Sequence, residues 1–132
     1  MSKKRKSFSL VKKIVINDIG ESDLLINGHL TRELFLLIQN LSIFIKNTEV
    51  ELYVSDVNEI CGMSLKIKEL HELVRNLCNV SIVVIMPAKR GYCTVANTVT
   101  FLEDRCKLEL NESFRFLLSA NAFSNLSDYL DK

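Results

Sequence analysis

Basic side chains with the type and spacing to bind phosphate groups occur in three segments of the chain. One segment lies at the start, one at residues 66–75 and one in the short segment 87–91. Cationic side chains hold phosphate oxygens through charge-assisted hydrogen bonds, so these segments are candidates for contact with a nucleic-acid backbone. The candidate contacts are Lys3, Lys4, Arg5, Lys6, Lys66, Lys68, His71, Arg75, Lys89 and Arg90.

The net charge of +1 conceals an uneven distribution of charge. Residues 1–13 contain basic side chains and no acidic one, whereas the rest of the chain has an excess of acids. We expect residues 1–13 to be a flexible basic arm and residues 14–132 to be one domain, because 132 residues suffice for a single core. A basic arm is attracted to a phosphate backbone or an acidic partner, although a solubilising tail or a cloning remnant has the same composition.

The elements that would position the central basic group are encoded in residues 54–86. This segment has the pattern of a short helix, a glycine turn, a longer helix and a β-rich run, which is typical of a helix-turn-helix followed by a wing. Ser55 and Ser64 are expected to cap the two helices, and Gly62 is expected to form the turn. The second helix has an apolar stripe that leaves its basic residues mostly on the polar face. The stripe consists of Ile67, Leu70, Leu73, Val74 and Leu77.

Acidic residues reduce the net positive charge of this second helix. Glu69 and Glu72 lie among its basic residues, so the helix is only weakly positive. Such a surface suits contact with the DNA backbone better than discrimination between bases. An amphipathic helix after a glycine turn is also common in domains that bind no nucleic acid.

The remaining elements are predicted from periodicity and caps. Thr31 is expected to cap a helix that runs to about residue 45, and Asn111 a helix over 112–119. Residues 50–54 alternate as a strand does, and residues 80–86, 92–102 and 106–110 are expected to form one three-stranded wing sheet. Residues 9–16 fit either a strand or a helix, and residues 17–22 have the composition of a loop.

Several functional classes lack sequence support. The four cysteines form no CxxC pair and lie far in sequence from both histidines, so neither a metal site nor a disulfide framework is expected. No nucleotide-binding glycine loop, HExxH or GxSxG motif occurs, so we expect no enzyme, no cofactor and no small-molecule substrate. The apolar run at 34–45 is short of the ~20 residues that span a bilayer, and no signal peptide is evident. A cytoplasmic protein is expected.

The order of these elements resembles the N-terminal winged-helix domain of plasmid replication initiator proteins of the Rep type. The similar segments are LTRELFLLIQNL (residues 30–41), VELYVSDVNEICGMS (50–64), LHELVRNLCNVSIVV (70–84) and KLELNESFRFLLSANAFSNLSDY (107–129). The resemblance implies an α+β winged helix-turn-helix with a small antiparallel wing sheet. It also implies a homodimer that touches the backbone of double-stranded DNA in plasmid replication initiation.

In that family a second, related winged-helix domain reads the repeated origin sequences, and no counterpart to it occurs in these 132 residues. Two interpretations follow: a fragment of a longer initiator, or a lone winged helix such as a small transcriptional or copy-control regulator. A protein–protein interaction module that uses the same fold without nucleic acid is the alternative from another class.

Overall fold

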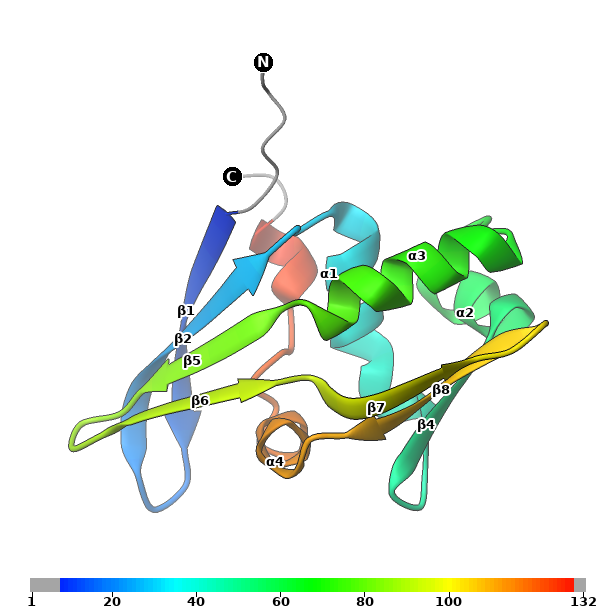
Figure 1. The fold of residues 1–132 in the computed structure, drawn as a ribbon. Helices are drawn as coiled ribbons and strands as arrows, with labels where there is room; N and C mark the ends of the chain where they lie inside the picture. The colour runs from blue at the N-terminus through cyan, green and yellow to red at the C-terminus, as the bar shows by residue number, and fades with distance from the viewer. Residues whose placement is uncertain (1–7, 130–132) are drawn as a thin grey trace.

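The computed structural model describes residues 8–129, which form an α+β fold with two antiparallel sheets (Figure 1). Within this range there are four α-helices, two short 3₁₀ helices and eight strands. No helix in residues 8–129 has the length and apolar character needed to cross a membrane.

The first sheet, sheet A, joins the start of the chain to its middle. Its strands are β1 (Phe8–Ile16), β2 (Gly20–Gly28), β5 (Ser81–Ile85) and β6 (Arg90–Thr94), in the order β1-β2-β5-β6. Successive residues of a strand face opposite sides of the sheet, so every second side chain enters the core. Leu24, Ile26 and Ile82 are fully buried in this way.

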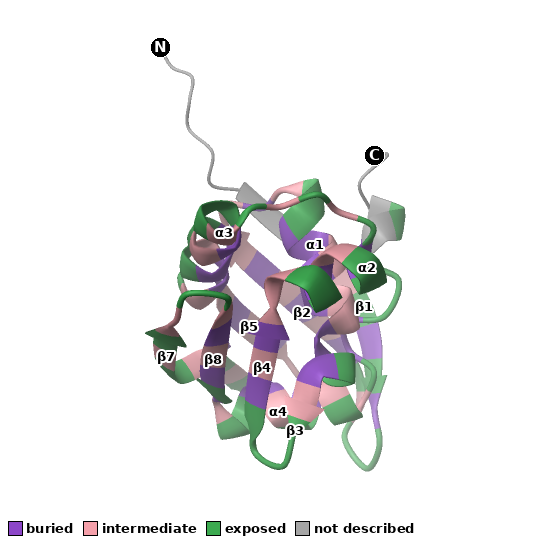
Figure 2. Cartoon of the chain, turned by 90° about the vertical axis from the view of Figure 1, so that its right-hand side faces the viewer, coloured by how far each residue is buried: buried purple, intermediate pink, exposed green. Residues whose placement is uncertain are grey.

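The second sheet, sheet B, has the order β3-β4-β8-β7. Its strands are β3 (Ile45–Lys46), β4 (Glu49–Tyr53), β7 (Ala96–Phe101) and β8 (Arg105–Leu110). Val50, Leu52 and Leu108 point inward and are almost fully buried. Figure 2 shows the resulting alternation of buried and less buried residues along β4 and β8.

The helices pack between and beside the two sheets. They are α1 (Arg32–Asn40), α2 (Val54–Cys61), α3 (Ile67–Cys78) and α4 (Glu112–Ser119), with 3₁₀ turns at η1 (Leu41–Phe44) and η2 (Leu126–Tyr129). Two predicted caps are confirmed: Thr31 accepts a hydrogen bond from the Leu34 N–H at 3.2 Å, and Asn111 accepts from Ser113 and Phe114. The helix after Thr31 ends at Asn40 and continues to Phe44 only as a 3₁₀ turn.

The predicted three-stranded wing sheet is wrong. The chain from Arg90 to Phe101 is divided at Val95: the part before it pairs with β5 in sheet A, and the part after it pairs with β8 in sheet B. The cause is the hairpin of β1 and β2. Because β2 pairs with β5, β5 belongs to sheet A and not to the sheet that contains β7 and β8.

The predicted boundary after residue 13 falls inside β1, so residues 8–13 belong to the folded domain. Lys12 faces the interior side of sheet A, and its Nζ donates to the Ala122 carbonyl oxygen at 2.9 Å. Partial burial lowers the pKa of Lys12. Lys3, Lys4, Arg5 and Lys6 lie outside the described residues.

Candidate nucleic-acid interface

The pair α2 and α3 is joined by a turn whose backbone is fixed by a glycine and an asparagine. Gly62 ends α2 with φ +68°, the left-handed conformation predicted for it. Asn58 then bridges the turn, because its side chain accepts from the Leu65 N–H at 2.8 Å and donates to the Leu65 carbonyl at 2.9 Å. Sequence reasoning missed Asn58, which lies inside a helix where asparagine has no obvious role.

Neither serine expected to cap these helices does so. Tyr53 occupies the N-cap position of α2 without a side-chain hydrogen bond, and Lys66 occupies that of α3. At α3 the Glu69 carboxylate accepts from the Lys66 N–H at 2.8 Å. The Asn58 bridge holds residue 65 outside the helix. Helix α3 therefore begins at Ile67, too far along the chain for Ser64 to be its N-cap.

The helix α3 presents a buried apolar face and an exposed polar face, as predicted. Leu70, Leu73, Val74 and Leu77 are buried, whereas Lys66, Lys68, Glu69, Glu72 and Arg75 are exposed. Neither Lys66 nor Lys68 forms an ion pair with any described residue, whereas Arg75 pairs with Glu72 at 3.2 Å. Because Glu72 pairs with Arg75, the start of α3 is left with the two unpaired lysines and the Glu69 carboxylate, which together give this end a small positive charge.

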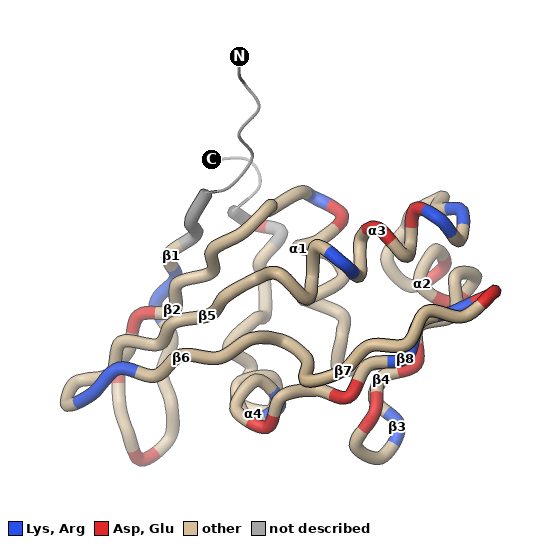
Figure 3. The backbone as a smooth tube through the Cα atoms, in the orientation of Figure 1, with Lys and Arg blue, Asp and Glu red and all other residues tan. Residues whose placement is uncertain are grey.

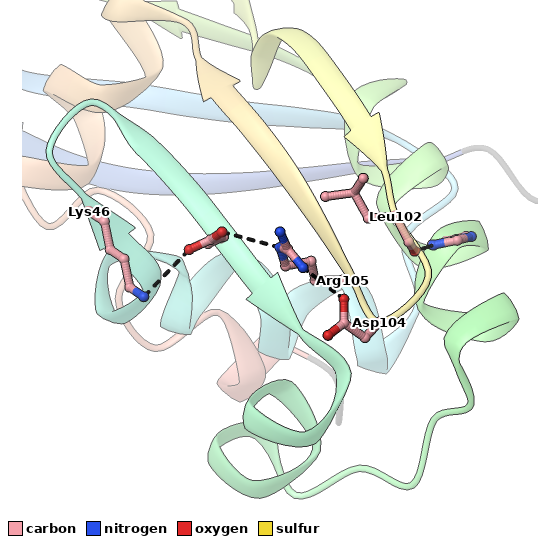
Figure 4. Close-up of polar contacts among 6 residues, drawn as sticks. Lys46, Leu102, Asp104 and Arg105 are labelled. Carbon is pink, nitrogen blue, oxygen red and sulfur yellow. Dashed lines mark hydrogen bonds and ion pairs between the residues drawn. The ribbon is translucent and has the colours of Figure 1, made fainter.

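His71 and Arg75 contact the hairpin of β7 and β8. The His71 Nε2 lies 2.9 Å from the Leu102 carbonyl oxygen, and its ring packs edge-on against Phe101 with centroids 5.1 Å apart. The Arg75 guanidinium stacks over the same Phe101 ring at 5.0 Å. Figure 4 shows Leu102, whose carbonyl oxygen makes this contact, near the tip of the hairpin. These two side chains therefore fix the hairpin to α3.

The hairpin beside α3 has an acidic tip, not the basic one expected. Its turn contains Glu103 and Asp104, both exposed. Lys89 lies instead in the turn between β5 and β6 of sheet A, and Arg90 is the first residue of β6. Figure 3 places that basic turn at one end of the molecule and the start of α3 at the other. The structure therefore does not bring the two predicted basic groups together.

The outer face of sheet B carries an ion-pair network that adjacent strands assemble (Figure 4). Glu51 lies 3.5 Å from Lys46 and 3.2 Å from Arg105, and Arg105 also reaches Asp104 at 2.9 Å. The hydrogen bond to Asp104 and the neighbouring negative groups raise the pKa of Arg105. Lys46 and Arg105 are thus already paired within the chain.

The described residues contain no cluster of three His, Cys, Asp or Glu side chains that could hold a metal ion. All four cysteines are free thiols, and burial raises the pKa of each one. The pKa of Cys106, in the middle of β8, rises to about 11. These thiols are protonated at neutral pH, which opposes nucleophilic chemistry.

No protein-family model matches the sequence, and no curated protein matches it significantly. Solved structures do match the fold. A selenomethionine crystal structure of domains 2 and 3 of RctB aligns with a TM-score of 0.54 at 10% identity, over 91% of this chain and 56% of that one. A second structure of RctB domains 2–3 aligns with a TM-score of 0.51 at 10% identity, over 85% and 54%.

This chain therefore spans little more than half the length of the RctB chains that it matches. At 10% identity the likeness concerns the fold alone. The fold is like that found in domains 2 and 3 of RctB.

Proposed function

We propose that this chain is a DNA-binding domain of the replication-initiator type, which contacts the phosphate backbone of duplex DNA through the start of α3. The observation that carries the proposal is the exposed, unpaired pair Lys66 and Lys68 at the start of the second helix of an α2–turn–α3 unit. The likeness of the fold to RctB supports a role related to replication.

We interpret the element order as a winged helix with an insertion. Helix α1, strand β4, helices α2 and α3, and the hairpin β7–β8 follow one another as in a winged helix, and β4 pairs with β8. The hairpin of β5 and β6 would be inserted between α3 and the wing. In this interpretation α3 lies against the groove while the acidic wing tip, held by His71, stays away from phosphates.

Binding would be mostly electrostatic and weakly dependent on sequence. Charged contacts to the backbone position a protein on DNA without reading bases. With about six phosphate contacts, the affinity should fall ~10³-fold between 50 and 200 mM salt. We further propose that the domain acts as a homodimer in plasmid-type replication, in the cytoplasm and without catalysis.

The test uses the double variant Lys66→Ala, Lys68→Ala. Its affinity for duplex DNA is measured by fluorescence anisotropy at low salt. When phosphate contacts are lost, fewer counterions are released from the DNA on binding. We therefore expect the affinity of the double variant to fall at least tenfold. The matched control is Lys46→Ala, because Lys46 is paired with Glu51 on sheet B. Equal affinity of the double variant and the unmodified chain would reject the proposal.

A protein–protein interaction module is the second candidate, favoured by the apolar side chains exposed on sheet A. Deleting residues 2–7, which precede β1, separates the two candidates without cutting into the fold. The interaction module would be favoured if the unmodified chain had no DNA affinity and if both the deletion variant and the double lysine variant still bound a protein partner.

A further inference from the structure

An open cleft lies between the interior side of sheet A and helix α4. Figure 1 shows that the turns between β1 and β2 and between β5 and β6 project beyond α4, so the helix leaves this end of the sheet uncovered. The cleft has a volume of about 410 Å³. Its walls are these two turns, strands β5 and β6, and the first two turns of α4. We call this space the α4 cleft.

The floor of the α4 cleft is apolar, and two apolar side chains are exposed around it. Ile82 and Val84 of β5 and Leu117 of α4 line the cleft and are buried. Ile19, in the turn between β1 and β2, is 37% exposed, and Phe116 of α4 is 52% exposed. Exposed aliphatic and aromatic side chains around an apolar hollow are typical of a site where a partner inserts a side chain.

Two charged side chains of opposite sign also line the α4 cleft. Lys89 comes from the turn between β5 and β6, and Glu112 is the first residue of α4; both are exposed. Neither forms an ion pair with any residue in the range 8–129, so they do not neutralise each other across the cleft. The cleft therefore presents a cation on one wall and a carboxylate on another, above an apolar floor.

We propose that the α4 cleft binds an amphipathic segment of another protein. The segment inserts a large apolar side chain into the floor and carries an acidic residue opposite Lys89 and a basic residue opposite Glu112. Charge complementarity selects this occupant, because a ligand of one charge satisfies only one of the two walls. An apolar anion such as a fatty acid would be attracted by Lys89 and repelled by Glu112, and a nucleic-acid backbone would meet the same repulsion.

The composition of the cleft sets the character of the contact. One inserted apolar side chain supplies most of the affinity, whereas exposed ion pairs add little affinity but discriminate between partners. We therefore expect weak binding whose specificity depends on the two charges. The turn with Lys89 lies at the opposite end of the molecule from the start of α3 (Figure 3), so a partner held in the cleft leaves Lys66 and Lys68 exposed. The inference is thus independent of the proposed function.

The test selects binders of the unmodified chain from a displayed library of random short peptides, without DNA. Enriched peptides should contain an aromatic or large aliphatic residue flanked by an acid and a base, and fluorescence anisotropy measures their affinity. Lys89→Glu should lower this affinity about tenfold, and replacing the acid of the peptide with lysine should restore it. Glu112→Lys should respond in the same way to a glutamate in place of the base of the peptide. Lys68→Glu is the matched control and should leave binding unchanged.

A second variant fills the cleft without a change of charge. Ser113 lines the cleft from an exposed position on α4, and only its backbone N–H bonds to Asn111. Ser113→Trp should therefore keep the fold and abolish peptide binding. Ser119→Trp is the matched control, because Ser119 is exposed on the same helix but does not line the cleft. Equal thermal unfolding of all variants establishes that the fold is kept.

The proposal would be overturned if no peptide were enriched, if Ser113→Trp still bound the peptides, or if both charge reversals left the affinity unchanged. Self-association in sedimentation velocity that Ser113→Trp abolishes would assign the cleft to a second copy of the chain. Binding of dodecanoate that displaces the peptides and outlasts Glu112→Gln unchanged would assign it to a small apolar anion. Either result would also overturn the proposal. Since no DNA is present, failure here leaves the DNA-binding proposal intact.

Discussion

His71 illustrates how a side chain chosen as a phosphate contact is already engaged within the chain. Its imidazole hydrogen-bonds the Leu102 carbonyl and packs against Phe101. We expect His71→Ala to lower the free energy of unfolding by about 1–2 kcal/mol, from one hydrogen bond and one aromatic contact. Urea unfolding measures this. The nearby Lys68→Ala should change stability by less than about 0.5 kcal/mol, and equal effects of the two changes would contradict the assignment.

Cys106 should make stability fall at alkaline pH. Its pKa rises from 9.0 to about 11 on folding, because the thiol is buried. The unfolded chain therefore loses this proton first, and stability that is complete below about pH 9 is lost as pH rises towards 11, by about 2 kcal/mol. Urea unfolding at a series of pH values measures the loss. The decline should be smaller in Cys106→Ala, and identical pH profiles would refute the cause.

At this scale the sequence predicted which residues are exposed but not which are paired. The stripe of α3 correctly separated Leu70 and Leu73 from Lys66 and Lys68. Arg75 also stacks on Phe101 of another element, and Arg105 also pairs with Glu51 of an adjacent strand, and periodicity carries no information about these two contacts. The roles of the predicted DNA contacts themselves stay predictions.

Helix ends show where local sequence signals suffice. Thr31 and Asn111 cap their helices as expected, because each side chain bonds to N–H groups two or three residues ahead. Ser64 does not cap α3, since Asn58 bonds to the backbone of residue 65, seven positions away. Ser55 does not cap α2, because that helix already begins at Val54. A local sequence pattern cannot reveal which of several polar side chains forms the hydrogen bonds that fix a turn.

The turn between α2 and α3 gives a prediction for Gly62. A Cβ at this position would meet no atom within 4 Å, so only the left-handed backbone, φ +68°, opposes a side chain. We expect Gly62→Ala to cost about 1 kcal/mol in unfolding free energy and Gly62→Asn less, because asparagine tolerates this conformation.

Gly91 is the matched control for that substitution. It lies in strand β6 outside the left-handed region, and an added Cβ would make ordinary contact with Met86 at 3.5 Å. Gly91→Ala should therefore be neutral or slightly stabilising in the same urea unfolding measurement. Destabilisation at Gly91 equal to that at Gly62 would show that backbone conformation is not the cause.

At the scale of the whole molecule, the sheets are what the sequence failed to predict. Strands 80–86 and 106–110 were recognisable from β-branched residues and alternation, but their partners depend on long-range pairing. The hairpin β1–β2 was missed because its first strand was ambiguous and the turn after Ile16 suggested a longer loop. Without that hairpin, β5 had no partner other than the supposed wing.

This topology separates the two predicted basic groups and so determines how DNA can lie. The start of α3 and the turn with Lys89 and Arg90 are at opposite ends of the molecule (Figure 3). If the duplex contacts only the α3 end, removing Lys66 and Lys68 should reduce the slope of log affinity against log salt by about 2. Fluorescence anisotropy over a salt series measures this slope, and the double variant Lys89→Ala, Arg90→Ala should leave it unchanged.

The opposite result has an equally definite meaning. Equal reductions in slope from both double variants would require a duplex that lies along the molecule and touches both ends. Glu103 and Asp104 would then have to face away from the duplex or be neutralised by salt, because two exposed carboxylates beside α3 repel phosphate. Changing both to their amides separates these cases: affinity should rise only if the hairpin tip lies close to the DNA backbone.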